Sequence, residues 1–320
     1  MSARLAAMLL VLSAIAVLIA LPFVLEKFYV QFATKVLVMA IFAASLNLLV
    51  GYTGLVSLGH AAFFGVAGYL LALATPAYDA AEFWSSLALA VGGAALLALA
   101  IGALVLRTSG IYFIMATLAF AQMLYFLFHD TSLAGGSDGI YIYVRPVAQL
   151  GGWQPFDLEN FVHLYFLVLA AFVLVLGFLR LLVDSPFGRT LAGIRVNEHR
   201  MRALGFATFR YKLVCFAVAG ALAGLAGYLS ALQFGVVNPD MLGWHLSGSA
   251  LMMVILGGLG TWLGPVLGAA SMMLLELGLQ SVTKHWQLLM GAAIVTVALA
   301  LPRGLAGLWV WRAARGQNDG

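Results

Sequence analysis

The sequence has little charge and almost no cysteine. Asp, Glu, Lys and Arg together make up 9% of its 320 residues, and Cys215 is its single cysteine. Because soluble domains are about one quarter charged, a chain this poor in charge and 64% hydrophobic is not a water-soluble protein. One cysteine, placed in an apolar segment, excludes an internal disulfide framework and any metal site built from several cysteines.

Motifs for ATP binding, metal binding and hydrolysis are missing as well. The dipeptide Gly-Lys never occurs, which excludes a P-loop, and the six histidines form no H-x-x-x-H pair that would suggest a metal site. The segment GGSDG, Gly135–Gly139, matches the nucleophile elbow of serine hydrolases, but it follows an apolar segment instead of a strand. We interpret it as a turn, and we expect neither catalysis nor a bound cofactor in this chain.

Long apolar segments recur along the whole chain. Their length suits helices that cross a bilayer, whereas barrel strands would alternate polar and apolar residues. We therefore predict an all-α integral membrane protein, one transmembrane domain over 1–320. The first segment is interpreted as a span and not as a signal peptide, because no clear cleavage site follows it. The ten predicted spans are 5–25, 34–50, 57–74, 84–106, 110–128, 161–183, 211–232, 244–258, 261–281 and 287–302.

The basic residues fall mostly on one side of these predicted spans. With the N-terminus inside, twelve of the sixteen bases lie in cytoplasmic segments, while most acids lie outside. The positive-inside rule therefore predicts that both termini and the loop 184–210 are cytoplasmic. It also places the loop 129–160, rich in Gly, Asp and aromatic residues, on the outer face as an ordered lid or docking surface.

Glycines interrupt the predicted spans at two places, Asn47–Gly59 (NLLVGYTGLVSLG) and Gly257–Gly268 (GGLGTWLGPVLG). If the second to fifth spans correspond to the seventh to tenth, the offset is odd and the two halves run in opposite directions. Inverted repeats with broken helices are typical of transporters, because freed backbone groups near the midplane can meet a polar substrate. Close helix packing is the alternative for each glycine taken singly. The candidate path residues are Asn47, Gly51, Thr53, Gly54, Ser57, Gly257, Gly258, Gly260 and Gly264.

Glu276 is the one carboxylate inside a predicted span. Ionisable groups within a membrane are costly and often functional, but a structural pairing with a neighbouring helix explains Glu276 equally well. A chain of carboxylates, which a proton-coupled carrier would use, is absent from the spans.

The segment Asp184–Lys212 concentrates charge, with six bases and two acids between apolar spans. Ser185 followed by Pro186 predicts an N-cap and a first helical residue, and Gly205 predicts the end of the helix. Arg195, Glu198 and Arg202 are spaced to share one polar face of this helix. A capped helix with two faces predicts docking of a cytoplasmic partner. The alternative is a loop that serves only as a topology signal.

Several segments together resemble the M-type permease subunit of branched-chain amino acid ABC importers. They cover most of residues 45–270. The matching stretches are LNLLVGYTGLVSLGHAAFFGVAGY from Leu46, RTSGIYFIMATLAFAQM from Arg107, AGGSDGI from Ala134, SPFGRTLAGIRVNEHRMRALG from Ser185, KLVCFAVAGALAGLAGYL from Lys212, and MVILGGLGTWLGPVLGA from Met253.

The resemblance implies a type II-like, multi-pass permease in a bacterial inner membrane. It implies four kinds of partner: membrane lipid, a second permease of the H type, a periplasmic amino-acid-binding protein, and two cytoplasmic ATPase subunits that bind ATP and Mg. It also gives the loop 184–210 the role of coupling to an ATPase. The coupling candidates are Arg189, Arg195, Asn197, Glu198, Arg200 and Arg202.

The expected function is that of a permease subunit that moves branched-chain or other hydrophobic amino acids along a path shared with the second permease. Urea and short-amide importers have much of the same glycine pattern, so they are the first alternative. A stand-alone secondary carrier, which is also built from inverted repeats, is the second. Nucleic acid is not an expected partner, because the bases lie beside apolar spans.

Overall fold

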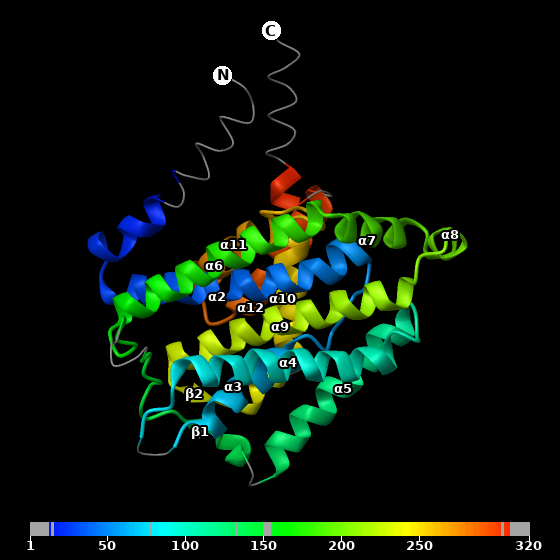
Figure 1. Ribbon diagram of the computed structural model, residues 1–320. Coiled ribbons are helices and arrows are strands. Elements are labelled where there is room, and N and C mark those ends of the chain that lie inside the picture. The colour runs from blue at the N-terminus through cyan, green and yellow to red at the C-terminus, as the bar shows by residue number, and fades with distance from the viewer. Residues whose placement is uncertain are drawn as a thin grey trace.

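Long apolar helices make up most of the structure (Figure 1). The computed structural model describes residues 16–76, 79–131, 134–149, 155–301 and 304–307, together with Ser13. Residues 16–24 are helical, and the helices that follow are α2 Lys27–Asn47, α3 Ala61–Ala74, α4 Phe83–Val105, α5 Ile111–Asp130, α6 Phe161–Asp184, α7 Pro186–Val196, α8 Glu198–Ala203, α9 Thr208–Phe234, α10 Trp244–Gly257, α11 Gly264–Val282 and α12 Trp286–Ala300.

Six of the helices in the described ranges are long and apolar enough to cross a membrane: Lys27–Thr53, α4, α5, α6, α9 and α11. The prediction of an all-α membrane protein is confirmed. The count of ten spans is not, since α3 and α10 have only 14 residues each. A helix of that length is about 21 Å long, whereas a bilayer core is about 30 Å thick. The predicted first span, 5–25, lies largely outside the described residues.

The second predicted span begins earlier and ends later than expected. It was predicted over 34–50, but the helix runs from Lys27 through a π-helical turn, η1 Leu48–Thr53. The start of the span was predicted next to Lys35 because a lysine near the end of a span is usually an outer residue. The residues before it are mostly apolar and continue the helix. Lys35 therefore lies within a membrane-spanning helix.

Helix α9 packs against α2, α3 and α4, and small residues form its contact with α4. Gly220 and Gly224 lie against Ala98 and Ala94 of α4, and a Cβ added at Gly224 would be 2.5 Å from the Cβ of Ala94. Such contacts let two helix backbones approach closely without a cavity between them. For these two glycines the packing interpretation is confirmed.

The short elements between the helices gather at opposite ends of the bundle (Figure 1). Helices α7 and α8 lie at one end. At the other end β1, Ile140–Tyr141, pairs antiparallel with β2, Val236–Val237. The GGSDG segment precedes β1 as a 3₁₀ turn, η3 Gly136–Asp138, so its interpretation as a turn is confirmed. A further 3₁₀ turn, η4 Pro239–Leu242, leads into α10.

The first prediction concerns these two ends. Leu204 is 65% exposed beyond α8 and Tyr143 is 74% exposed beside β1, while the native Cys215 is buried and should react little. We expect Leu204→Cys and Tyr143→Cys to react with a membrane-impermeant maleimide from opposite faces of sealed vesicles. Labelling of both from one face would contradict the arrangement of the bundle.

Candidate functional site

The charged loop forms two helices joined at an extended residue. The Oγ of Ser185 accepts a hydrogen bond from the N–H of Gly188 at 3.3 Å, so the predicted cap of α7 is confirmed. Helix α7 then ends, because Asn197 is extended, with φ −158° and ψ 98°. Its Oδ1 accepts from the N–H of Arg200 at 2.9 Å and thereby caps α8. Gly205, with φ 88°, follows the end of α8 as predicted.

The prediction of a single helix with one polar face is therefore wrong. Asn side chains bind backbone N–H groups at helix starts, and here Asn197 forms that bond in place of the backbone bonds of a continuous helix. Arg195 belongs to α7, whereas Glu198 and Arg202 belong to α8. Glu198 and Arg202 bind each other, whereas Arg195 has a separate partner in the membrane helices.

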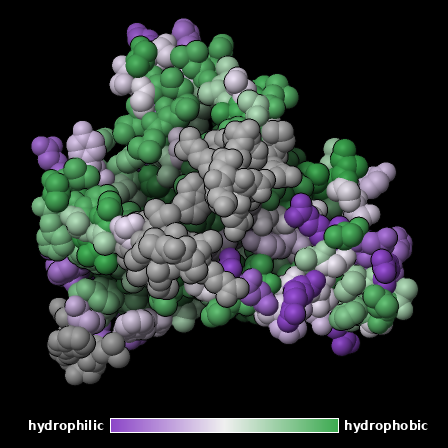
Figure 2. All heavy atoms as spheres, turned by 90° about the horizontal axis from the view of Figure 1, so that it is seen from above, coloured by the Kyte–Doolittle hydropathy of each residue, from purple (hydrophilic) through white to green (hydrophobic). Residues whose placement is uncertain are grey.

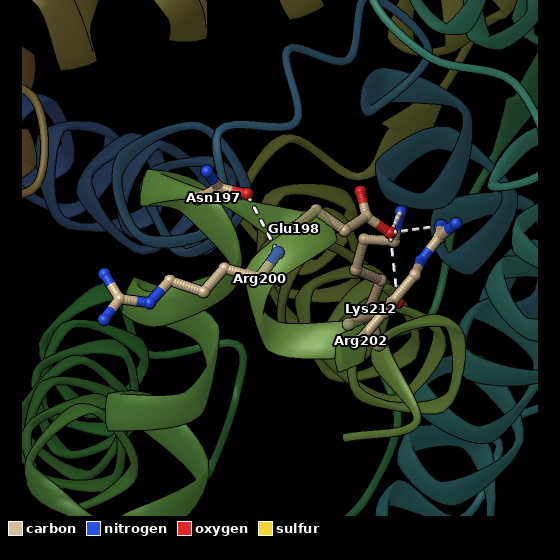
Figure 3. A network of polar contacts seen from close by, with 6 residues as sticks. Asn197, Glu198, Arg200, Arg202 and Lys212 are labelled. Carbon is tan, nitrogen blue, oxygen red and sulfur yellow. Dashed lines mark hydrogen bonds and ion pairs between the residues drawn. The ribbon is translucent and has the colours of Figure 1, made fainter. Parts of the chain in front are cut away.

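A network around Glu198 fixes α8 to the start of α9 (Figure 3). One carboxylate oxygen, Oε1, accepts from Nη2 of Arg202 at 2.6 Å, Nζ of Lys212 at 2.8 Å and Oγ1 of Thr208 at 3.0 Å. The side chain of Lys212 is only 8% exposed, so this amine depends on Glu198 for its counter-charge. Charge-assisted hydrogen bonds of this kind are among the stronger polar contacts in proteins.

The network also sets the titration of Glu198. Partial burial acts to raise the pKa of its carboxyl, but hydrogen bonds from Lys212 and Arg202, the Lys212 charge and the Thr208 hydroxyl outweigh it. The net result is a pKa below the ordinary value, so Glu198 is ionised at neutral pH. The joint between α8 and α9 is therefore an ion pair at neutral pH.

Arg195 points back to the membrane helices instead of outward. Its Nη1 donates a hydrogen bond to the carbonyl oxygen of Gly51 in the π-helical turn η1. Its Cγ would be 3.3 Å from a Cβ added at Gly54, whose φ of 75° favours glycine. On the same helix, Leu191 and Ile194 are buried. Helix α7 is thus packed onto the first glycine break.

The two predicted breaks meet each other through Asn47. Its Oδ1 accepts from the N–H of Gly260 at 3.0 Å, and its Nδ2 donates to the carbonyl of Thr261 at 3.0 Å. A Cβ at Gly51 would be 2.6 Å from the nitrogen of Gly260, so the two backbones touch. Arg195 of α7 also binds Gly51, so the contact between the two glycine segments lies at the α7 end of the bundle. The expectation that these breaks lie at the midplane, with their backbone groups free, is not met.

The other candidate path residues have local roles. Gly257 and Gly264 pack α10 against α11, and a Cβ at Gly264 would be 2.5 Å from the carbonyl of Gly258. The hydroxyl of Thr53 donates to the carbonyl of Leu49, and the Oγ of Ser57 accepts from the N–H of Gly59.

Sequence reasoning missed Thr208, Lys212 and Thr261 as members of the site. Lys212 had a signal that could have been used. It is a base at the very start of an apolar span, where a buried position requires an acidic partner.

The solvent-exposed surface of α7 and α8, called their outward surface below, carries both basic and apolar side chains. The side chains of Arg189 on α7 and Arg200 on α8, and of Arg210 in the first turn of α9, are exposed and form no hydrogen bond or ion pair within the described part of the chain. Val196, the last residue of α7, and Leu204, just after α8, are also exposed, at 86% and 65%. Seen from above, hydrophilic side chains gather on the right, the side on which α7 and α8 lie (Figure 2). A surface that mixes free guanidinium groups with exposed aliphatic residues suits a protein partner.

Comparisons with known proteins agree with one another. Residues 28–298 match the family model described as branched-chain amino acid transport system, permease component. The high-affinity branched-chain amino acid transport system permease protein LivM of Escherichia coli is 30% identical over 90% of this chain and 72% of its own length. The same protein of Salmonella typhimurium is 29% identical over 93% and 74%.

A shorter match is the autoinducer 2 import system permease protein LsrC of Photorhabdus laumondii, which is 34% identical over 30% of this chain and 31% of its own. No solved structure matches the chain.

The second prediction tests the Glu198 network. Glu198→Gln leaves the buried ammonium of Lys212 without a counter-charge, so α8 should open from α9 more often. We expect amide hydrogen exchange over residues 198–206 to accelerate by about tenfold. Asp184→Asn is the matched control, because the Arg180–Asp184 pair is more than half exposed on both sides and should matter little. Equal effects of the two substitutions would contradict the network.

The same network predicts the sign of a pH dependence. A carboxyl whose folded pKa is lowered contributes stability above its ordinary pKa and loses it as the pH falls through the folded value. The ordinary value is 4.5, so the joint should be unchanged from neutral pH to about pH 5 and should loosen only in stronger acid. The mobility of a spin label on Leu204→Cys reports this opening.

Proposed function

This chain belongs to the family of branched-chain amino acid transport system permease components, and from that membership we propose that it is the M-type permease subunit of an ATP-driven importer of branched-chain amino acids. The single observation that supports this most is the family match over residues 28–298. Similarity to the LivM proteins over about nine tenths of the chain supports the same substrate class and favours it over urea or short amides.

The proposed complex contains four kinds of partner for this chain. A second permease of the H type shares the translocation path, two cytoplasmic ATPase subunits bind ATP and Mg, and a periplasmic binding protein delivers the amino acid. Membrane lipid surrounds the spans. In this arrangement both termini and the loop 184–210 are cytoplasmic, and the loop 129–160 faces the binding protein, as the distribution of bases suggests. A stand-alone carrier would have no use for an exposed docking surface on α7 and α8.

The ATPase contact is proposed to lie on the outward surface of α7 and α8. Of the coupling candidates, Arg189 and Arg200 are exposed there with free guanidinium groups. Leu204 lies beyond α8 and adds an exposed aliphatic group. Asn197 shapes this surface because it caps α8 and turns the chain between the two helices.

Arg195 and Glu198 are proposed to transmit movement from that surface. Arg195 joins α7 to the helix Lys27–Thr53 at Gly51, and Glu198 joins α8 to α9 through Lys212. Asn47 extends the first joint to the segment between α10 and α11. A shift of α7 and α8 caused by closure of the ATPases would thus reach both long helices directly.

We also propose that α2–α5 and α9–α12 are inverted repeats. The helix Lys27–Thr53 and α9 both have 27 residues, and the helices that follow them, α3 and α10, both have 14. Helix α9 packs on α3 and α4 much as α2 packs on α10 and α11. With this pairing the counterpart of the break after Thr53 is the segment Gly235–Gly243. It replaces the pairing of Asn47–Gly59 with Gly257–Gly268 that the glycine pattern suggested.

A transport assay tests the proposed function. Proteoliposomes that contain the two permeases and the ATPases, supplied with the binding protein, should take up labelled leucine only when ATP is present on the ATPase side. A complex whose ATPase cannot hydrolyse ATP is the control and should take up none. Uptake of labelled urea in place of leucine, or leucine uptake by this chain alone, would contradict the proposal.

Two sets of variants separate docking from transmission. Arg200→Ala with Leu204→Ala should lower retention of the ATPase on purification by about tenfold, as loss of exposed anchor residues does at interfaces. Arg195→Ala should keep the ATPase bound but reduce leucine uptake per ATP hydrolysed, since its contact is with Gly51. Arg107→Ala, an exposed base beyond the end of α4, is the control. If Arg195→Ala loses the ATPase and Arg200→Ala does not, the assignment is reversed.

A further inference from the structure

A cavity of about 370 Å³ lies between α2, α9 and α11, away from the α7 end of the bundle. Its volume is within the range of small-molecule pockets, about 300–1,000 Å³. Lys35 of α2 and Glu276 of α11 both line it. The remaining wall is largely apolar and includes Phe32, Met273 and Leu277. None of these residues belongs to the coupling joints described above.

The two charges of this cavity do not neutralise each other. Both side chains are half-buried within membrane helices, yet no ion pair joins them to each other or to another group in the described ranges. Among the described residues, the Oε1 of Glu276 accepts from the amide of Gln280 alone, at 3.1 Å. Charged groups inside a membrane span are costly and face a cavity or a partner. An unpaired cation and an unpaired anion on one cavity leave room for a molecule that carries both charges.

A third polar residue, Gln233, also lines the cavity, and one of its side-chain atoms has no partner among the described residues. The Nε2 of Gln233 donates to the carbonyl of Gln31 at 2.7 Å, but its Oε1 is buried and accepts no hydrogen bond from any described residue. Because this oxygen is enclosed by protein atoms, it would accept from a bound ammonium group only after the Gln233 side chain turned toward the cavity.

We propose that this cavity binds the amino acid during transport, with Lys35 on the α-carboxylate and Glu276 on the α-ammonium. The side chain of the amino acid lies against Met273 and Leu277. Met273 is 3% exposed, and its flexible thioether adapts to aliphatic chains of different branching. This proposal rests on the proposed function, because it names where the substrate of the importer is held within this chain.

Direct binding tests the proposal without the selectivity of the binding protein. The purified complex of permeases and ATPases is titrated with leucine and with two analogues, leucinamide, which lacks the carboxylate, and 4-methylpentanoate, which lacks the amine. Saturation-transfer NMR gives the relative affinities. The unmodified complex should bind each analogue about tenfold more weakly than leucine, because each loses one charge-assisted contact.

The variants should remove these preferences one at a time. Lys35→Gln should abolish the preference for leucine over leucinamide and keep the preference over 4-methylpentanoate, and Glu276→Gln should do the opposite. Lys35→Arg, which keeps the charge, should retain both preferences. Lys284→Gln and Glu82→Gln are the matched controls, because both residues are exposed outside the helices, and both preferences should survive.

The failures of the two proposals are distinguishable. If the complex transports leucine but Lys35→Gln and Glu276→Gln keep both preferences, the cavity is not the site, and the proposed function stands. Equal affinity of the unmodified complex for leucine and both analogues would likewise overturn the cavity assignment, even if the variants assemble poorly. If the complex transports no branched-chain amino acid, the function itself fails.

Discussion

Inside a membrane, a helix that breaks must find new partners for the backbone groups that the break frees, because lipid offers none. In this protein distant side chains supply those partners. Asn47 binds the segment between α10 and α11, and Arg195 binds the carbonyl of Gly51. At the start of α3, the Oγ of Ser247 accepts the N–H of Ala61 at 2.8 Å. Each of these breaks is hydrogen-bonded to another helix or its adjoining segment, so the breaks add contacts between the helices of the bundle.

The few charges of the chain divide into two groups with different physics. Around Glu198 they are paired, and the carboxylate accepts three hydrogen bonds, so the group is a stable joint at neutral pH. Lys35 and Glu276 lie inside spans and remain unpaired among the described residues. A paired charge contributes to structure, whereas an unpaired one within a membrane helix keeps its desolvation cost until a ligand offsets it.

Local rules predicted what depends on neighbours in the sequence. The cap at Ser185, the end of α8 at Gly205 and the turn in GGSDG follow from the preferences of Ser, Pro and Gly. The break at Asn197 was missed because helical periodicity in the charges was given more weight than the capping tendency of Asn. The contact of Arg195 with Gly51 joins residues 144 positions apart, and no local pattern contains it. The unpaired state of Lys35 and Glu276 likewise depends on how three helices approach one another.

The two groups of charges are connected by the two longest helices. The helix Lys27–Thr53 bears Lys35 on the cavity and Gly51 at the α7 joint, 16 residues or about 24 Å apart. Helix α9 bears Gln233 on the cavity and Lys212 at the α8 joint, about 32 Å apart at 1.5 Å per residue. A helix transmits displacement along its axis because each turn is hydrogen-bonded to the next.

In the proposed mechanism, a movement of α7 and α8 therefore shifts two walls of the cavity together. Glu276 lies on the third wall, α11, which is linked to this movement through the contact of Asn47 with the segment between α10 and α11. The distance between the cation and the anion would then differ between the two states of the ATPases. That difference is what a site needs in order to bind a zwitterion on one side of the membrane and release it on the other.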